Sequence, residues 1–276
     1  MTLSDRPASA LRGCYVISLR PVGEHASMRR AAAAHGARTL ALSPWRLVAR
    51  DGQALPLLRQ ALGAPIAIFT SPAAVQAAAG MAPLSAKPGQ LRLAVGATTA
   101  AALRRAGVAE PVYPQRMDSE GLLGLPALTE VTGMHIGLVT APEGRSFLTE
   151  SLQARGARVL RADVYDRIPV PPAPQAIARL RALPPGTPLV LALSSGLALE
   201  MLVDSLPADI ADRLRGALVT AASARLVELA QGLGFSAVVQ GADARPASLL
   251  AAAASAARQG NKHGANVAAI TPETAR

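Results

Sequence analysis

The sequence predicts an α/β protein built from two similar three-layer domains with parallel sheets. Apolar runs alternate with helical patterns along most of the 276 residues, which is the order that βαβ units require. Two of these runs, LVLAL at 189–193 and IAIF at 66–69, are apolar at every position, as expected for parallel strands covered on both faces. In addition, one part of the chain repeats the other in a permuted order, so the same architecture should occur twice.

The apolar runs define ten candidate strands, with helical stretches between most of them. In chain order these are Tyr15–Leu19, Arg38–Leu42, Pro65–Phe69, Leu91–Val95, Val112–Tyr113, Ile136–Thr140, Arg158–Val164, Leu189–Leu193, Ala217–Thr220 and Ser236–Val239.

The repeat is clearest in residues 134–170, which read as a strand, a turn, an amphipathic helix ended by Gly156, and a second strand. Residues 15–46 follow the same plan. Later segments also correspond, and they place Ser71 opposite Ser194 and Thr99 opposite Ser223. Spacings of 121 residues relate Ile136, Leu138, Pro142 and Gly144 to Tyr15, Ile17, Pro21 and Gly23.

The order of these units predicts a circular permutation. One copy is continuous through residues 65–165, whereas the other starts with its last unit at the N-terminus and resumes after residue 187. If both copies fold alike, residues 13–42 join residues 171–258 in one discontinuous domain, and residues 46–167 form the other. Residues 1–12 and 259–276 are then flexible termini.

The chain must cross between these domains twice, at residues 41–48 and 163–170. Both crossings carry proline, which disfavours helix, so we expect two extended antiparallel linkers that pair as a short ladder and act as a hinge. The cleft between the two domains is then the expected ligand site.

Composition favours a small polyanionic ligand. The net charge is +10, and all but two of the 28 basic residues are arginine, whose planar guanidinium suits carboxylate and phosphate. Aromatic residues make up 3% of the chain and basic runs are missing, so no nucleic-acid partner is expected. Cys14 is the one cysteine and reads as an inert buried thiol. No signal peptide or membrane-length apolar run occurs, which predicts a soluble cytoplasmic protein without a membrane partner.

The sequence lacks the usual motifs of cofactor and metal chemistry. No glycine-rich fingerprint follows a strand, and the four histidines show no metal-ligand spacing, so neither metal nor cofactor is expected. Small-residue turns between strand and helix recur instead, and they contain Ser71, Thr99, Ser194, Ser195 and Ser223. Such residues cap a helix and leave backbone N–H groups that attract anions, although plain capping explains any single turn as well.

The chain resembles the uroporphyrinogen-III synthase family in an ordered series of short sequence pieces. The matching pieces fall in order between residue 13 and about residue 250. They are Leu19-Arg20-Pro21, Phe69-Thr70-Ser71, Val95-Gly96 with Thr99-Ala100, Ser119-Glu120-Gly121-Leu122, Gly144-Arg145 with Leu148, Arg155-Gly156-Ala157, Val164-Tyr165, Ser194-Ser195 and Ser223-Ala224. The chain departs from the family pattern at Leu19, Thr140-Ala141, Ala73 or Ala74, and Leu193.

The resemblance implies a cofactor-independent lyase that closes linear hydroxymethylbilane into uroporphyrinogen III, with loss of water and inversion of the terminal (D) ring through a spiro intermediate. It further implies a monomer that receives its substrate by transient hand-over from the preceding enzyme of heme biosynthesis. Tyr165 is the implied catalytic residue, since it could hydrogen-bond or protonate the leaving hydroxyl. The residues that we expect to bind substrate are Arg20, Pro21, Ser71, Thr99, Ser119, Gly144, Arg145, Ser194, Ser195, Ser223 and Arg225.

Other interpretations stay open at this stage. A hinged two-domain protein with anion-binding turns could be a non-catalytic binding module for an acidic tetrapyrrole or another polyanionic metabolite. A nicotinamide- or flavin-dependent enzyme is disfavoured by the missing glycine fingerprint. Tyr165 itself could be a packing residue of the hinge rather than a catalytic one.

Overall fold

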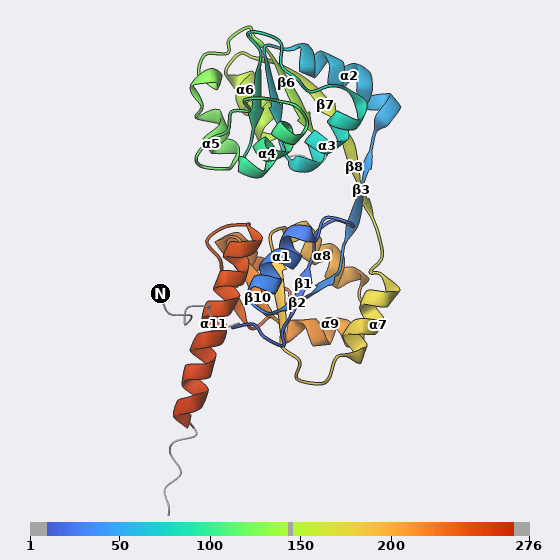
Figure 1. Ribbon diagram of the computed structural model, residues 1–276, viewed down its shortest axis with the longest axis vertical. Helices are drawn as coiled ribbons and strands as arrows, with labels where there is room; N and C mark the ends of the chain where they lie inside the picture. Colours follow the sequence, from blue (N-terminus) through green and yellow to red (C-terminus); the bar gives the residue numbers. More distant parts are fainter. Residues whose placement is uncertain (1–9, 143–145, 268–276) are drawn as a thin grey trace, which may run out of the picture. The chain divides into compact units, whose positions relative to one another are not determined.

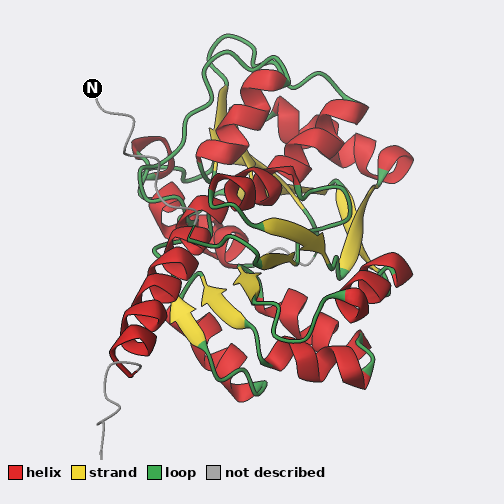
Figure 2. Ribbon diagram, turned by 60° about the horizontal axis from the view of Figure 1, so that its bottom comes forward, coloured by secondary structure: helices red, strands yellow, loops and turns green. Residues whose placement is uncertain are grey.

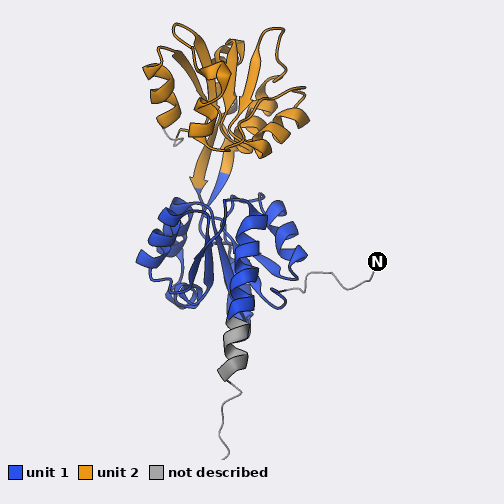
Figure 3. Cartoon of the chain, turned by 90° about the vertical axis from the view of Figure 1, so that its left-hand side faces the viewer, with its two compact units in different colours: residues 1–46, 169–276 blue, residues 47–168 orange. Residues whose placement is uncertain are grey.

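The computed structural model describes residues 10–142 and 146–267. The chain divides into two compact units, residues 1–46 with 169–276 (unit 1) and residues 47–168 (unit 2), which Figure 3 distinguishes by colour. In each unit, helices flank a parallel sheet (Figure 2). This confirms the predicted fold class of two α/β units with parallel sheets.

The sheet of unit 1 has five parallel strands in the order β11-β10-β9-β1-β2. Strand β1 lies between β2 and β9, and Tyr15 is in register with Arg38 on one side and with Leu189 on the other. The first strand of the chain is therefore central to a sheet whose other half is about 170 residues away in sequence. The strands are β1 (Tyr15–Ser18), β2 (Arg38–Ala41), β9 (Leu189–Leu193), β10 (Leu218–Ala221) and β11 (Val238–Gln240).

Small side chains build the core of unit 1, as the low aromatic content requires. On one face, Val16 and Val190 pack with Met28 of α1 and with Leu249 and Leu250 of α11. Figure 1 shows α1 and α11 beside this sheet. The helices of unit 1 are α1 (Ala26–Ala34), α7 (Pro174–Ala182), α8 (Gly196–Ser205), α9 (Ala208–Arg215), α10 (Ala224–Gly232) and α11 (Pro246–Val267).

The sheet of unit 2 has four parallel strands in the order β5-β4-β6-β7. Beyond β5, Val112 adds an isolated parallel bridge to Leu93. The elements are α2 (Asp51–Gly63), β4 (Ile66–Phe69), α3 (Pro72–Met81), β5 (Leu91–Ala94), α4 (Ala97–Arg105), α5 (Ser119–Leu123), the short 3-10 helix η1 (Pro126–Leu128), β6 (His135–Thr140), α6 (Phe147–Ala154) and β7 (Arg158–Asp163).

Unit 2 has a separate apolar cluster on each face of its sheet. Phe69 packs with Leu58 of α2 and Leu103 of α4 in one cluster, whereas Ile68 packs with Leu122 and Leu152 in the other. Neighbouring residues of β4 therefore serve opposite faces, which is why this strand is apolar at every position.

Two further strands, β3 (Trp45–Ala49) and β8 (Tyr165–Pro169), pair in a two-stranded sheet. Before β3, the Pro44 carbonyl accepts a hydrogen bond from the Val170 N–H at 3.0 Å; after β3, the Arg50 N–H donates to the Val164 carbonyl at 3.0 Å. The two segments therefore run in opposite directions, as expected for the linkers. The strand content of residues 45–49 was not among the ten predicted strands.

Both units use the same spatial order of repeat elements. In unit 1 the chain order 1, 2, 9, 10, 11 becomes the spatial order 11-10-9-1-2, and in unit 2 the bridge at Val112 takes the place that β11 holds in unit 1. The circular permutation read from the sequence thus describes real correspondence between the two sheets.

The helix ends of the two copies also correspond. After α1 and after α6, a glycine at positive φ follows the last turn, and the next N–H bonds to the carbonyl five residues before it: Ala37 N–H to Ala32, and Ala157 N–H to Leu152. The same arrangement ends α4 at Gly107 and α10 at Gly234. These glycines are required because the left-handed conformation is costly for other residues.

Several local predictions are wrong. Val112–Tyr113 forms one isolated bridge rather than a strand, β1 ends at Ser18 rather than Leu19, and β11 begins at Val238 rather than Ser236. The repeat register also shifts by helix caps: Ser71 corresponds to Ser195, and Gly96 rather than Thr99 corresponds to Ser223. Among the described residues, no helix is long and apolar enough to cross a membrane.

One glycine allows close packing of helix and sheet in unit 2, and this gives a test of the fold. A Cβ on Gly137 of β6 would overlap the backbone carbonyl of Ala61 in α2. Gly137→Ala should therefore destabilise the protein by about 1–3 kcal/mol, the range for overpacking, in urea unfolding followed by circular dichroism.

Gly80→Ala in α3 is the matched control, because a Cβ there meets no atom within 4 Å. It should be neutral or stabilise by up to about 1 kcal/mol, since alanine favours helix. Equal destabilisation by both substitutions would contradict the close approach of α2 to β6.

Candidate functional site

Each sheet has one pair of neighbouring strands whose next strands in the chain lie on opposite sides, so that the connections after the two strands run in opposite directions. In unit 2 this switch point lies between β4 and β6, and in unit 1 between β9 and β1. Open parallel sheets bind ligands at the carboxyl ends of the strands that flank such a point. In each unit, the candidate site residues are therefore those that follow the strands beside its switch point.

The unit 2 switch point carries a hydroxyl cluster. The Thr70 hydroxyl after β4 donates to the Thr140 hydroxyl at the end of β6, at 2.9 Å, and the Thr70 N–H donates to the Val139 carbonyl at 3.2 Å. Ser71 caps α3, because its Oγ accepts the Ala74 N–H at 3.0 Å. The Tyr165 hydroxyl lies 3.4 Å from the Ser71 Oγ. Residues from three elements, of which Tyr165 and Ser71 were predicted, thus meet here.

Arg50 binds both residues that flank Tyr165 in the chain. The Arg50 N–H bonds the Val164 carbonyl, and its guanidinium forms a two-pronged ion pair with Asp166, with N–O distances of 2.8 and 2.7 Å. Hydrogen bonding to Arg50 lowers the pKa of Asp166, so the carboxylate stays charged. Tyr165 is 4% exposed and belongs to the apolar cluster around Phe69, so its ring packs in the core while its hydroxyl lies beside the Ser71 Oγ.

Arg20 is the cation of the unit 1 switch point. It follows β1 after one residue, it is partly buried, and its Nε is enclosed without a hydrogen-bond partner among the described residues. Burial lowers the pKa of Arg20, and Glu24 partly offsets this effect. A half-buried guanidinium with an unused N–H is suited to receive a carboxylate. Pro21 lies beside it at the start of a turn that Glu24 closes with its N–H on the Pro21 carbonyl at 3.0 Å.

A buried histidine at the same switch point was missed by the sequence analysis. The ring nitrogens of His25 lie 2.9 Å from the Ser18 Oγ and 2.9 Å from the Ser43 Oγ. Burial, followed by the charges of Arg29 and Arg20, lowers the pKa of His25. The available signal was a lone histidine just before a helix, which by itself does not distinguish a core residue from a site residue.

The remaining predicted residues of unit 1 lie after β9 and β10. Ser195 caps α8 with its Oγ 3.4 Å from the Ala198 N–H, and the neighbouring Ser194 is exposed. Ser223 occupies the N-cap of α10 without a side-chain hydrogen bond, and Arg225 is exposed in the first turn of that helix. These residues share the carboxyl edge of the unit 1 sheet with Arg20.

One predicted turn in unit 2 differs from the expected capping. The N-cap of α4 is Gly96, Thr99 is buried one turn inside the helix, and the Ala97 N–H donates to the Met117 Sδ at 3.4 Å. The predicted open N–H at this turn is therefore covered by a thioether. Ser119 is the first residue of α5, whose N-cap is the preceding Asp118, and the Asp118 side chain accepts the Gly121 N–H at 2.7 Å.

Gly144 and Arg145 lie outside the described residues. The segment just before them is fixed by Arg161 of β7, which bonds the Ala141 and Pro142 carbonyls at 2.9 Å each. The same guanidinium pairs with Asp163 at 2.9 Å.

Part of the arginine excess is structural. Arg92, Arg155 and Arg213 each bond two or more backbone carbonyls at loop or helix ends, such as Leu123 and Leu128 for Arg155, both at 2.7 Å. No group of three or more His, Cys, Asp or Glu that could hold a metal occurs in the part of the chain that the structure describes.

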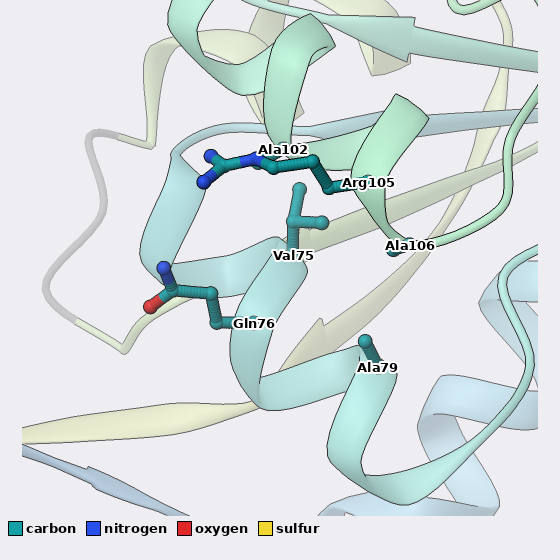
Figure 4. Close-up of a pocket in the computed structure, with 6 residues that line it drawn as sticks. All are labelled: Val75, Gln76, Ala79, Ala102, Arg105 and Ala106. Carbon is teal, nitrogen blue, oxygen red and sulfur yellow. The ribbon is translucent and has the colours of Figure 1, made fainter.

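A shallow groove between α3 and α4 lies apart from the switch points. It encloses about 290 Å³, and Figure 4 shows the side chains that line it. Arg105 borders it, with its Nε on the Ala101 carbonyl at 3.3 Å. None of the predicted site residues lines this groove, which is formed by Val75, Gln76, Ala79, Ala102, Arg105 and Ala106.

Fold and switch points together define a two-unit α/β protein with a permuted internal repeat. A family model described as uroporphyrinogen-III synthase HemD matches residues 26–251, which is most of the chain. The chain belongs to the uroporphyrinogen-III synthase family, as the resemblance predicted.

Individual relatives match over shorter stretches. The chain is 39% identical over 75 residues to the uroporphyrinogen-III synthase of Escherichia coli K12, and 40% identical over 75 residues to that of Salmonella typhimurium LT2. Each match covers 27% of this chain and 30% of the relative, so the chain aligns with about a third of these curated relatives.

Solved structures show the same fold. A mutant uroporphyrinogen-III synthase of Thermus thermophilus matches with a TM-score of 0.53 at 22% identity, and the Helicobacter pylori enzyme with a TM-score of 0.57 at 15% identity. Both matches cover 89% of this chain and 99% of the other.

The two serine caps allow a matched test of the site geometry. Ser71 and Ser223 have nearly the same backbone angles, φ −158° and ψ 159° against φ −159° and ψ 162°, but only Ser71 makes a capping bond. Ser71→Ala should cost about 1 kcal/mol of unfolding free energy, whereas Ser223→Ala should stay within about 0.5 kcal/mol of wild type. Equal losses in urea titrations would contradict the assigned caps.

Proposed function

We propose that this protein is a uroporphyrinogen-III synthase that cyclises hydroxymethylbilane without a cofactor. The observation that carries the proposal is the family match over residues 26–251, a span that contains the β4/β6 switch point and the β9 side of the unit 1 switch point. The polar and cationic side chains at these points, Arg20 foremost, support a substrate that carries eight carboxylates.

The proposed reaction needs positioning more than strong acid–base chemistry. The hydroxymethyl C–O bond breaks, the leaving hydroxide takes a proton to become water, and the remaining azafulvene cation is attacked by the substituted carbon of the terminal ring. The spiro intermediate then fragments and recloses with that ring inverted, and a ring proton is lost. Because the open bilane closes unaided to the symmetric isomer, the protein must hold one geometry, which can contribute several kcal/mol.

In this proposal the predicted residues have two different tasks. Tyr165, next to Ser71, assists departure of the hydroxyl, while Arg20, Arg225 and Arg145 bind carboxylates. The hydroxyl cluster around Ser71 and the turns at Thr99, Ser119, Ser194, Ser195 and Ser223 line the path of the substrate, together with Pro21 and Gly144. We further propose a cytoplasmic monomer that receives its substrate by transient hand-over from the preceding enzyme. Gel filtration of the protein alone tests the monomer, and gel filtration of its mixture with the preceding enzyme tests the hand-over.

The direct experiment is an assay that separates the two product isomers. Purified protein with hydroxymethylbilane should yield mainly the III isomer, after subtraction of spontaneous closure. Tight binding of the tetrapyrrole without turnover would overturn the enzyme proposal and favour a non-catalytic binding module.

Tyr165→Phe tests the catalytic residue, because it keeps the buried ring but removes the hydroxyl next to Ser71. The rate should fall about 10- to 100-fold with little change in KM, at the low end of general-acid effects because the hydroxyl departs readily. The product should shift toward the I isomer. Tyr113→Phe, at an exposed tyrosine, is the control. A wild-type rate for Tyr165→Phe would assign Tyr165 to packing alone.

Neutralising Arg20 tests carboxylate binding. Arg20→Gln and Arg225→Gln should each raise KM about 3- to 10-fold, and the salt dependence of KM should weaken, since fewer charge pairs are left to screen. Arg59→Gln, at an exposed position of α2, makes the same change in net charge and should leave KM as it is. If all three variants change KM alike, only the net charge of the protein matters, and Arg20 and Arg225 are not specific carboxylate-binding residues.

A further inference from the structure

His25 is a buried group at the unit 1 switch point that the proposed function does not use. It is 3% exposed and directly precedes α1. Its Nδ1 lies 2.9 Å from the Oγ of Ser18, the last residue of β1, and its Nε2 lies 2.9 Å from the Oγ of Ser43, which follows β2. One imidazole ring therefore ties together the ends of two neighbouring strands, because β1 and β2 pair in parallel.

The residues between Ser18 and His25 form a turn that this bridge closes. The Glu24 N–H bonds the Pro21 carbonyl at 3.0 Å, and the Val22 N–H bonds the carbonyl of Trp45 at 3.0 Å. Arg20 is part of the turn. The direction of the Arg20 side chain therefore depends on this turn, which is held at its end by the imidazole bridge and in its middle by the hydrogen bond between Val22 and Trp45.

Burial and the neighbouring charges favour the neutral form of the ring. Burial, then Arg29 of α1, then Arg20 of the turn, lower the pKa of His25 below its ordinary value of 6.5. A neutral imidazole has one donor and one acceptor nitrogen, and a serine hydroxyl can satisfy either. Both bonds therefore form without adding a second cation beside Arg20, whose Nε is left for a ligand.

We propose that His25 is a positioning residue: by bridging Ser18 and Ser43 it holds the turn 19–24, and thereby aims the Arg20 guanidinium at a carboxylate of the substrate. The inference rests on the proposed function for its substrate. It assigns to the Ser18–His25–Ser43 bridge a role in affinity, acting through Arg20 and not by contact with the bilane.

The test combines variants that open the bridge with the loss of Arg20. Ser43→Ala removes one hydroxyl, and His25→Gln replaces the ring by an amide that can reach one of the two serines. Each should raise KM about 3- to 10-fold while kcat changes less than about twofold. In the Arg20→Gln background the same changes should have no further effect on KM, because the residue that they position is gone. His135→Gln, at an exposed histidine, is the control.

A role in folding alone gives a different pattern. If His25→Gln and Ser43→Ala lower stability but leave KM unchanged, or raise KM equally with and without Arg20, the positioning role is wrong. A wild-type protein that makes no III isomer would instead overturn the proposed function. In that case affinity for the stable octacarboxylate uroporphyrin, followed by quenching of Trp45 fluorescence, replaces KM in the same set of variants.

The protonation state supplies a readout independent of activity. Because the folded-state pKa of His25 is lowered, the unfolded chain binds a proton more readily, and stability should fall as pH drops below about 6.5. Wild type should lose more unfolding free energy between pH 7.5 and 5.5 than His25→Gln. Ring nitrogen NMR should show His25 as neutral at pH 7, with a pKa below its ordinary value of 6.5. A His25 signal that titrates at or above 6.5 would contradict the enclosed neutral bridge.

Discussion

The pairing of β1 with β9 is the constraint on which the rest of the structure depends. Tyr15 is in register with Leu189, so the start of the chain is locked into a sheet whose other strands follow much later. Residues 47–168 must therefore form a compact unit of their own between the two halves of unit 1. The chain has to leave and return, and the paired strands β3 and β8 are the consequence.

The same constraint places the functional groups. Since both sheets share one spatial order, each has its switch point beside the first strand of the same repeat unit, β6 in unit 2 and β1 in unit 1. Arg20 follows β1, and Thr140 ends β6. Arginine then serves two purposes in this protein: Arg92, Arg155 and Arg213 bind carbonyls of their own chain, whereas Arg20 keeps an N–H that no described group uses. Total charge alone does not separate these uses.

Periodicity and internal repetition predicted the fold class and most strands, because buried parallel strands have an unmistakable apolar pattern. They failed where a contact distant in sequence decides the outcome. Val112 pairs with β5 in one isolated bridge, Met117 covers the turn before α4, and Arg50 binds Asp166 of β8 from more than a hundred positions away. The role of His25 was not predicted for the same reason, because only folding brings Ser18 and Ser43 to its ring.

The central claim is that the residues which follow the strands at each switch point, Arg20 foremost, bind a polyanionic substrate. Backbone amide NMR of the isotope-labelled protein during titration with uroporphyrin tests it most directly. We predict shift changes at the residues that follow β1 and β9 in unit 1 and at the residues that follow β4 and β6 in unit 2. Shift changes that spare these residues, or that centre on the groove between α3 and α4, would contradict the account.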